Sequence, residues 1–103
     1  MDELRLRLID LMIDDREQID ELYLGVNYFR RDNCLMKRRA EYRLFQVVAC
    51  LRELETEGLI ARHVSRGAGM DCDELCCEFG VTERGSATWN QNVSVLERLY
   101  EEE

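Results

Sequence analysis

The sequence predicts an α+β fold that is mostly α-helical, with a two-stranded β-hairpin in the second half of the chain. Apolar residues recur at helical spacing between residues 42 and 57, which is typical of a helix with one buried face. Gly58 follows the last periodic residues and suits the left-handed turn that ends many helices. Two short apolar runs, 59–64 and 75–82, flank a loop-like segment with two glycines at 65–74 and are expected to pair as strands.

Two helices are expected before this region. Residues 3–13 carry apolar side chains around most of a helix, which places that helix either at the centre of the core or partly against another subunit. Asp15 is expected to cap a second helix, with Gln18 completing a capping box. The apolar stripe of the second helix is Ile19, Leu22, Tyr23 and Val26.

The connection from 27 to 39 has two interpretations. Asp32 or Asn33 can cap an early start of the central helix, or the segment is an irregular basic connection and the helix begins near Arg39. A connection of that length is unusual in a compact domain, so we expect the helix to begin between Asp32 and Arg39. Its inward stripe is then Leu44, Val47, Val48, Leu51 and Leu54.

A last helix is expected from Thr82 to about Tyr100. Thr82 is a suitable N-cap, whereas Gly85 weakens the first turn relative to alanine. One face carries Trp89, Val93, Leu96 and Tyr100. The acidic residues 101–103 follow at the negative pole of the helix dipole, where they are expected to fray.

Length and composition indicate one globular domain, residues 1–103. The chain has 103 residues, 46% hydrophobic and 35% charged, with no apolar run near the length that spans a membrane. The N-terminal MDELRLRLID lacks the features of a secretory signal, so we expect a cytoplasmic protein.

The net charge of −8 argues against indiscriminate binding to nucleic acid. Its distribution is uneven, however: segment 30–43 has six basic residues (Arg30, Arg31, Lys37, Arg38, Arg39 and Arg43) and two acidic ones (Asp32 and Glu41). This segment therefore nets +4 and the rest of the chain −12. A local basic stripe is compatible with a specific DNA site and equally with an acidic protein partner.

The five cysteines match no disulfide framework and no zinc-ligand spacing. Cys50 falls in the central helix and is most simply a small, semi-buried apolar residue. Cys72, Cys76 and Cys77 form a metal or redox site only if neighbours such as His63 converge on them, and reduced structural thiols are the preferred interpretation. We expect no enzymatic activity, no metal and no cofactor.

Two strings carry a resemblance to a known superfamily. LRELETEGLI (51–60) is similar to the helix-to-strand junction of winged helix-turn-helix proteins, and FGVTERGSATW (79–89) to their second wing strand entering the next helix. Within that superfamily, these strings especially resemble PadR-like and MarR-like transcriptional regulators. The resemblance covers about forty residues. It implies a single winged-helix domain in which the central helix reads DNA and the hairpin 59–82 is the wing.

The resemblance, with a helical wheel of residues 38–57, gives the candidate DNA-binding residues. The outward face carries Arg38, Arg39, Tyr42 and Gln46, beside Arg43. Arginine and glutamine can pair with guanine and adenine in a major groove, and tyrosine can reach a phosphate. In the wing, Arg66 is the candidate for phosphate or minor-groove contact.

The leading hypothesis is a sequence-specific DNA-binding regulator that binds a pseudo-palindromic double-stranded site as a homodimer, through apolar surface on the first and last helices. The alternative is a winged-helix protein–protein interaction module, such as an adaptor or an acidic antagonist of a nucleic-acid-binding protein. The negative net charge and the acidic returning half of the wing (Asp71, Asp73 and Glu74) support the alternative.

Overall fold

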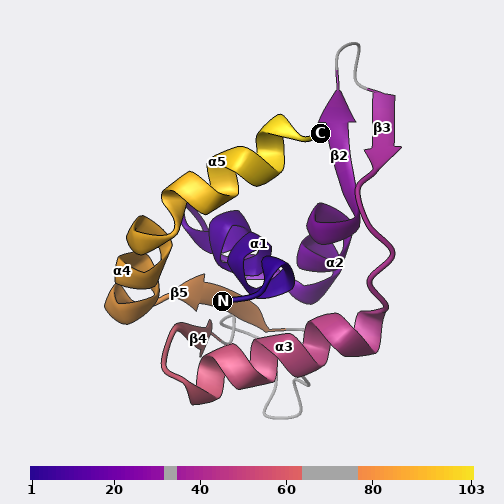
Figure 1. Ribbon diagram of the computed structural model, residues 1–103. Coiled ribbons are helices and arrows are strands. Elements are labelled where there is room, and N and C mark those ends of the chain that lie inside the picture. Colours follow the sequence, from indigo (N-terminus) through magenta and orange to yellow (C-terminus); the bar gives the residue numbers. More distant parts are fainter. Residues whose placement is uncertain (32–34, 64–76) are drawn as a thin grey trace.

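The computed structural model describes residues 1–31, 35–63 and 77–103 (Figure 1). Over these residues the protein is a mostly helical α+β structure with two small antiparallel sheets. The elements are α1 (Glu3–Met12), β1 (Glu17–Gln18), α2 (Ile19–Asn27), β2 (Tyr28–Arg31), β3 (Leu35–Arg38), α3 (Leu44–Thr56), β4 (Ile60–His63), β5 (Glu78–Val81), α4 (Glu83–Gln91) and α5 (Val93–Glu101).

Helix α1 lies at the centre of the molecule, in contact with α2, α3, α4 and β5 (Figure 1). Four of its apolar side chains are almost fully buried: Leu6, Leu8, Ile9 and Met12. Of the two interpretations of its broad apolar surface, this burial confirms the central one. The surface is therefore occupied within the chain itself, and the homodimer stays a prediction without that support.

The larger sheet has the strand order β1-β5-β4, and both pairs are antiparallel. Ile60 pairs with Val81 and His63 with Glu78, which confirms the expected pairing of the two apolar runs. The two-residue strand β1, which pairs with the outer edge of β5, has no counterpart in the sequence prediction. A strand this short carries no periodic signal.

The junction after α3 follows the expected chemistry. Gly58 has a φ of 77°, and the N–H of Leu59 donates to the carbonyl of Leu54 at 3.0 Å, so a left-handed residue ends the helix. Thr82 caps α4 by accepting from the N–H of Gly85 at 3.1 Å. Its hydroxyl also donates to the carbonyl of Gly58 at 2.7 Å, which ties the two helix ends together.

Gly85 has a role that helix propensity does not reveal. A Cβ atom at this position would lie 2.0 Å from the carbonyl oxygen of Leu59. The first turn of α4 therefore packs directly on the backbone between α3 and β4, and only glycine permits this approach.

Several expected boundaries are wrong. Helix α2 begins after Gln18 rather than Asp15, because residues 17 and 18 pair as a strand with β5. The carboxylate of Asp15 instead accepts from the N–H of Arg16, so the expected capping box is absent.

The last helix is two helices, α4 and α5, separated at Asn92. The break allows both of them to reach α1: Trp89 Nε1 donates to Asp10 Oδ1 at 2.9 Å, and the Tyr100 hydroxyl donates to Asp10 Oδ2. Burial raises the pKa of Tyr100, and its bond to the Asp10 carboxylate raises it further. Each carboxylate oxygen of Asp10 thus accepts a hydrogen bond from one of the two C-terminal helices and holds it against α1.

The central helix begins at Leu44, later than the expected start between Asp32 and Arg39. Residues 28–31 and 35–38 pair as the strands β2 and β3 of a second hairpin, instead of a helical start or an irregular connection. The inward stripe is correct for Val47, Leu51 and Leu54, and Val48 is half-buried. Leu44, at the first position of the helix, is instead exposed.

Candidate nucleic-acid interface

The basic hairpin, strands β2 and β3, projects from the body of the molecule beside the end of α5 (Figure 1). Tyr28 lies opposite Arg38, and Arg30 lies opposite Met36. Directly opposed residues of an antiparallel pair share a face, as do residues two apart on one strand. One face of the hairpin therefore presents two arginines beside a tyrosine and a methionine.

Asn27 holds the two ends of the hairpin together. Its side chain accepts from the N–H of Tyr42 at 2.7 Å and donates to the carbonyls of Tyr23 and Tyr42, each at 3.0 Å. Its own carbonyl accepts from the N–H of Arg39 at 2.6 Å. Buried polar groups are tolerated when they are bonded in this way, so the buried Asn27 fixes where the hairpin leaves and rejoins the fold.

The Arg38 side chain is held on the hairpin by Tyr28. Its Nη2 donates to the hydroxyl of Tyr28 at 2.8 Å, and its guanidinium lies 5.3 Å from the centre of that ring. Glu41 makes an ion pair with Nη1 at 3.3 Å, but the Arg38 side chain remains 53% exposed. Exposed pairs of this kind are weak, so an external anion can compete for Arg38.

The N-terminal end of α3 lies next along the same surface. Arg43 is the N-cap residue, and its N–H donates to Oε1 of Gln46 at 2.8 Å. This bond closes the first turn with the glutamine carbonyl and leaves the amide NH₂ of Gln46 available as a donor. Phe45, between them, is 66% exposed and Leu44 is 45% exposed.

A pocket of about 380 Å³ lies between the hairpin and this end of α3. Tyr28, Arg38, Tyr42 and Arg43 are among the residues that line it. Burial raises the pKa of the Tyr42 phenol above its ordinary value, so this hydroxyl stays protonated and can donate.

The structure therefore gathers four of the six predicted site residues (Arg38, Tyr42, Arg43 and Gln46), although not as one helix face. Arg38 is on β3, and Tyr42 lies in the segment before α3. The expected helical face through Arg38, Arg39 and Tyr42 is wrong because these residues precede the helix.

Arg39 does not join the other four. Its side chain is 10% exposed, donates to the carbonyl of Gly25 at 2.7 Å and forms an ion pair with Glu103. Arg66 lies outside the described residues, as do the acidic residues of the expected wing tip (Asp71, Asp73 and Glu74).

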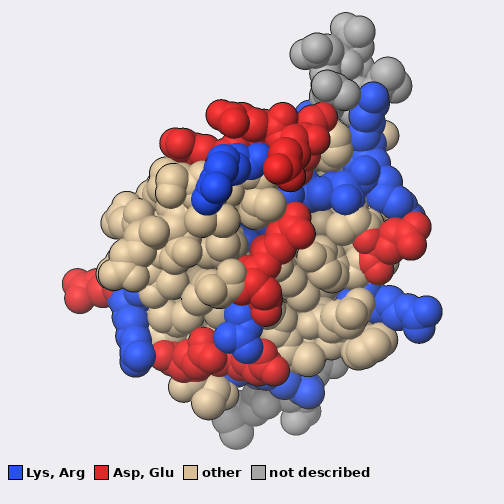
Figure 2. Space-filling model, in the orientation of Figure 1, with Lys and Arg blue, Asp and Glu red and all other residues tan. Residues whose placement is uncertain are grey.

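Positive charge is concentrated on the hairpin and at the start of α3. Figure 2 shows a column of basic side chains over the hairpin and a second basic group near the start of α3, with acidic side chains between them. The exposed basic residues of the hairpin and the start of α3 are Arg30, Lys37, Arg38 and Arg43, of which Lys37 is on the opposite face of the hairpin from Arg30 and Arg38. Sequence analysis did not select Arg30 and Lys37 as site residues, although the charge of segment 30–43 was the signal that contained them.

The far half of α3 is acidic. Glu53 and Glu57 both make ion pairs with Arg5 of α1, the latter at 3.1 Å. Glu55 is paired as well, with Arg62 at 2.9 Å, so the acidic side chains of this half are held in ion pairs with neighbouring elements.

The described thiols are internal. Cys50 and Cys77 are both buried, and burial raises the pKa of Cys50 to about 12, which keeps its thiol neutral. The interpretation of Cys50 as a small buried apolar residue is confirmed, whereas Cys72 and Cys76 lie outside the described residues. Over residues 1–31, 35–63 and 77–103, no group of three or more histidine, cysteine, aspartate or glutamate residues is placed to hold a metal ion.

No protein-family model matches this chain, and no curated protein matches it. Membership of the winged-helix superfamily therefore stays a prediction. Within the part of the chain that the structure describes, no helix is long and apolar enough to cross a membrane.

Proposed function

We propose that this protein is a winged-helix transcriptional regulator that binds a specific double-stranded DNA site with the start of α3 and the basic hairpin. The element order supports this proposal: three helices, α1 to α3, are followed by the antiparallel pair β4–β5, and β1 completes a three-stranded sheet. The basic hairpin would then be an insertion between the two helices of the helix-turn-helix.

The observation that carries the proposal is the grouping of Arg30, Lys37, Arg38 and Arg43 on one region of a protein whose net charge is −8. Cationic side chains are needed there because contacts with phosphates supply most of the affinity for DNA and fix the orientation of the protein. The acidic charge elsewhere would repel DNA from other surfaces.

The start of α3 offers side chains that can read bases. Gln46 has a free amide donor, and a glutamine can bond the edge of adenine in the major groove. Phe45 and Ala49 are exposed on the same helix and can contact a thymine methyl group. Arg39 is not among the proposed DNA contacts, because its side chain pairs with Glu103 and donates to the carbonyl of Gly25.

A homodimer on a pseudo-palindromic site remains part of the proposal. It is supported by docking geometry alone, since two half-sites one helical turn apart multiply the specificity of one small module.

The test begins with selection of bound sequences from a random DNA pool at moderate salt. Affinity for an enriched site and for a scrambled one is then measured as a function of salt for the parent, Lys37→Gln and Arg43→Gln. Each phosphate contact that is lost should reduce the salt slope by about 1 and weaken both DNAs alike.

Two variants complete the design. Gln46→Ala should lose about 1–3 kcal/mol of preference at one base position. Arg98→Gln, which removes an exposed charge from α5, is the matched control and should behave like the parent. A parent protein that cannot distinguish the two DNAs at low salt would refute the proposal.

One observation favours a second candidate, a protein–protein interaction module that acts as an adaptor or an acidic antagonist. Phe45 is 66% exposed and Met36 is 55% exposed, and exposed aromatic and methionine side chains are common at protein interfaces. Under this candidate, Phe45→Ser should abolish capture of a protein partner. Under DNA binding, Lys37→Gln should cause the larger loss of affinity for DNA.

A further inference from the structure

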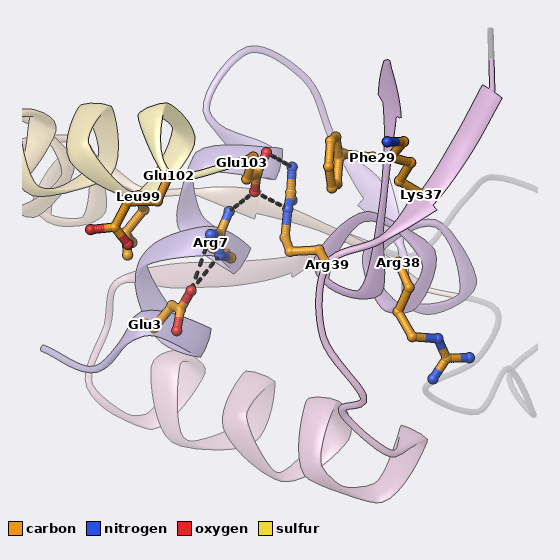
Figure 3. Close-up of a pocket in the computed structure, with 9 residues that line it drawn as sticks. All are labelled: Glu3, Arg7, Phe29, Lys37, Arg38, Arg39, Leu99, Glu102 and Glu103. Atoms are coloured by element: carbon orange, nitrogen blue, oxygen red, sulfur yellow. Dashed lines mark hydrogen bonds and ion pairs between the residues drawn. The ribbon is translucent and has the colours of Figure 1, made fainter.

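A second pocket lies on the other side of the basic hairpin, between the start of α1 and the end of α5 (Figure 3). Its volume is about 360 Å³. The residues that matter here are Glu3 and Arg7 of α1, Phe29 and Lys37 of the hairpin, Arg39 and Glu103. We call it the arginine pocket, after Arg7 and Arg39.

The two arginines converge on one carboxylate. Arg7 Nη1 donates to Glu103 Oε1 at 3.0 Å, and Arg39 Nη2 donates to Glu103 Oε2 at 3.1 Å. Arg39 Nε also lies in ion-pair contact with Glu103 Oε1, although it is not aligned for a hydrogen bond. Figure 3 shows both guanidinium groups pointing at Glu103, whereas Arg38 points away.

The remaining guanidinium nitrogens are fixed by the fold. Arg7 directs Nε and Nη2 to Glu3 Oε1, at 3.1 and 3.0 Å. Arg39 Nη1 donates to the carbonyl of Gly25 at 2.7 Å. Each arginine is therefore oriented by one partner and presents its other side to the position of the Glu103 carboxylate, which is a preformed geometry for an oxyanion.

Aromatic rings hold the arginines from the sides. The Tyr100 ring centre is 5.3 Å from the Arg7 guanidinium and 5.4 Å from that of Arg39, which also lies 5.4 Å from the centre of Phe29. Such contacts stabilise a cation without neutralising it. An anion is still required, because the Arg7 and Arg39 side chains are only 3% and 10% exposed and an uncompensated buried charge is strongly destabilising.

Glu103 reaches the two arginines from just beyond helix α5. It lies beyond the last residue of α5, Glu101, and its N–H donates to the carbonyl of Tyr100 at 3.2 Å. The Glu103 carboxylate is held by its ion pairs with Arg7 and Arg39 and is not part of the hydrophobic core cluster.

We propose that the arginine pocket is a binding site for a small dianion bearing a carboxylate or phosphate group, and that Glu103 occupies it when the ligand is absent. One oxyanion replaces the Glu103 carboxylate between Arg7 and Arg39. Lys37, which lines the same pocket and is exposed, pairs with the second negative charge. Lys37 is shared with the proposed DNA contacts, whereas Arg7 and Arg39 take no part in them, so the test below follows the two arginines and Glu103.

The test uses Glu103→Gln, which keeps the size of the side chain and removes the competing charge. Binding of succinate and of inorganic phosphate to the full chain is measured by calorimetry, at constant ionic strength maintained with sodium chloride. Glu103→Gln should bind at least one of the two about tenfold or more tightly than the parent, because the tethered competitor is lost. Preference for succinate would assign a carboxylate, and preference for phosphate a phosphate group.

Glu103→Gln combined with Arg39→Gln should lose this binding. The proposal is overturned if Glu103→Gln binds neither anion better than the parent, or if the double variant binds as well as Glu103→Gln.

A second measurement covers the case in which the double variant does not fold. In the parent chain labelled with ¹⁵N, titration with the same anions should shift the Nε–H signals of Arg7 and Arg39 and leave that of the exposed Arg98 unchanged. Equal shifts at all three arginines, or shifts at Arg98 alone, would refute a specific site.

Discussion

The two hairpins of this protein have opposite relations to the core. In β4–β5, a third strand covers one edge, and the Phe79 side chain is 1% exposed within the main core cluster. The basic hairpin has two strands, and its Met36 is 55% exposed. An isolated two-stranded hairpin is marginally stable, so this one depends on Asn27 at its base. The comparison teaches that one hairpin contributes apolar side chains to the core, whereas the other places its charged side chains in solvent.

The largest effect should come from truncating the core of the β4–β5 hairpin. Phe79→Ala removes a fully buried ring and leaves a cavity, which is expected to cost about 3–5 kcal/mol. Met36→Ala on the basic hairpin is the control and should change stability by no more than about 0.5 kcal/mol. Urea denaturation measures both. Equal losses from the two substitutions would mean that the basic hairpin also contributes to the core.

A smaller loss should follow from adding one methyl group at the junction beside β4. Gly85→Ala places a Cβ against the Leu59 carbonyl, which backbone shifts must relieve at a cost of about 1–3 kcal/mol or more. Gly58→Ala is the matched comparison, because the space around Gly58 is open and the cost there arises from φ alone, about 1–2 kcal/mol. Thermal denaturation should rank Gly85→Ala as the less stable variant; the reverse order would show that α4 can move away from Leu59.

The third prediction concerns β1, the third strand of the larger sheet. The sheet of the basic hairpin has only the two strands β2 and β3. The pKa of Glu17 is raised to about 7, first because its carboxyl shares a hydrogen bond with Glu21, then by desolvation and by the charges of Glu21, Asp15 and Glu78. The folded protein therefore holds a proton on Glu17 that the unfolded chain releases near 4.5, the ordinary value. Stability should fall as pH rises from about 4.5 to about 7, since the folded state binds more protons in that range.

Glu17→Gln removes this titration and should be more stable than the parent at pH 8, with the difference shrinking towards pH 5. Urea denaturation at several pH values measures the effect, with Glu97→Gln on the exposed surface of α5 as the control. Parallel pH profiles for the parent and Glu17→Gln would contradict the prediction.

The parts of the fold that were predictable have short-range causes. Gly58 and Thr82 act on their own helix ends, and the pairing of β4 with β5 follows from two apolar runs on either side of a turn-like segment. The basic hairpin was missed because neither of its strands alternates apolar and polar residues. Its position depends on Asn27, whose partners are as far away as Tyr42.

The candidate site was predictable only by composition. The charge of segment 30–43 indicated where positive charge is concentrated, but not which side chains face outward. Arg38 and Arg39 are neighbours of the same type, yet one is on the surface of a strand and the other is buried against Glu103. Sequence analysis expected residues 101–103 to fray, so it could not anticipate that Glu103 pairs with Arg39 and not with Arg38.

The closure at Asn27 also has a meaning for variation and engineering. Because its carbonyl accepts from the N–H of Arg39, strands β2 and β3 leave and rejoin the rest of the fold at one point and form a cassette. The entropy of closing such an excursion changes only slowly with its length. The cassette is therefore expected to tolerate changes in length as long as the hydrogen bonds of Asn27 are kept. This position is thus a natural site for inserting other segments into the protein.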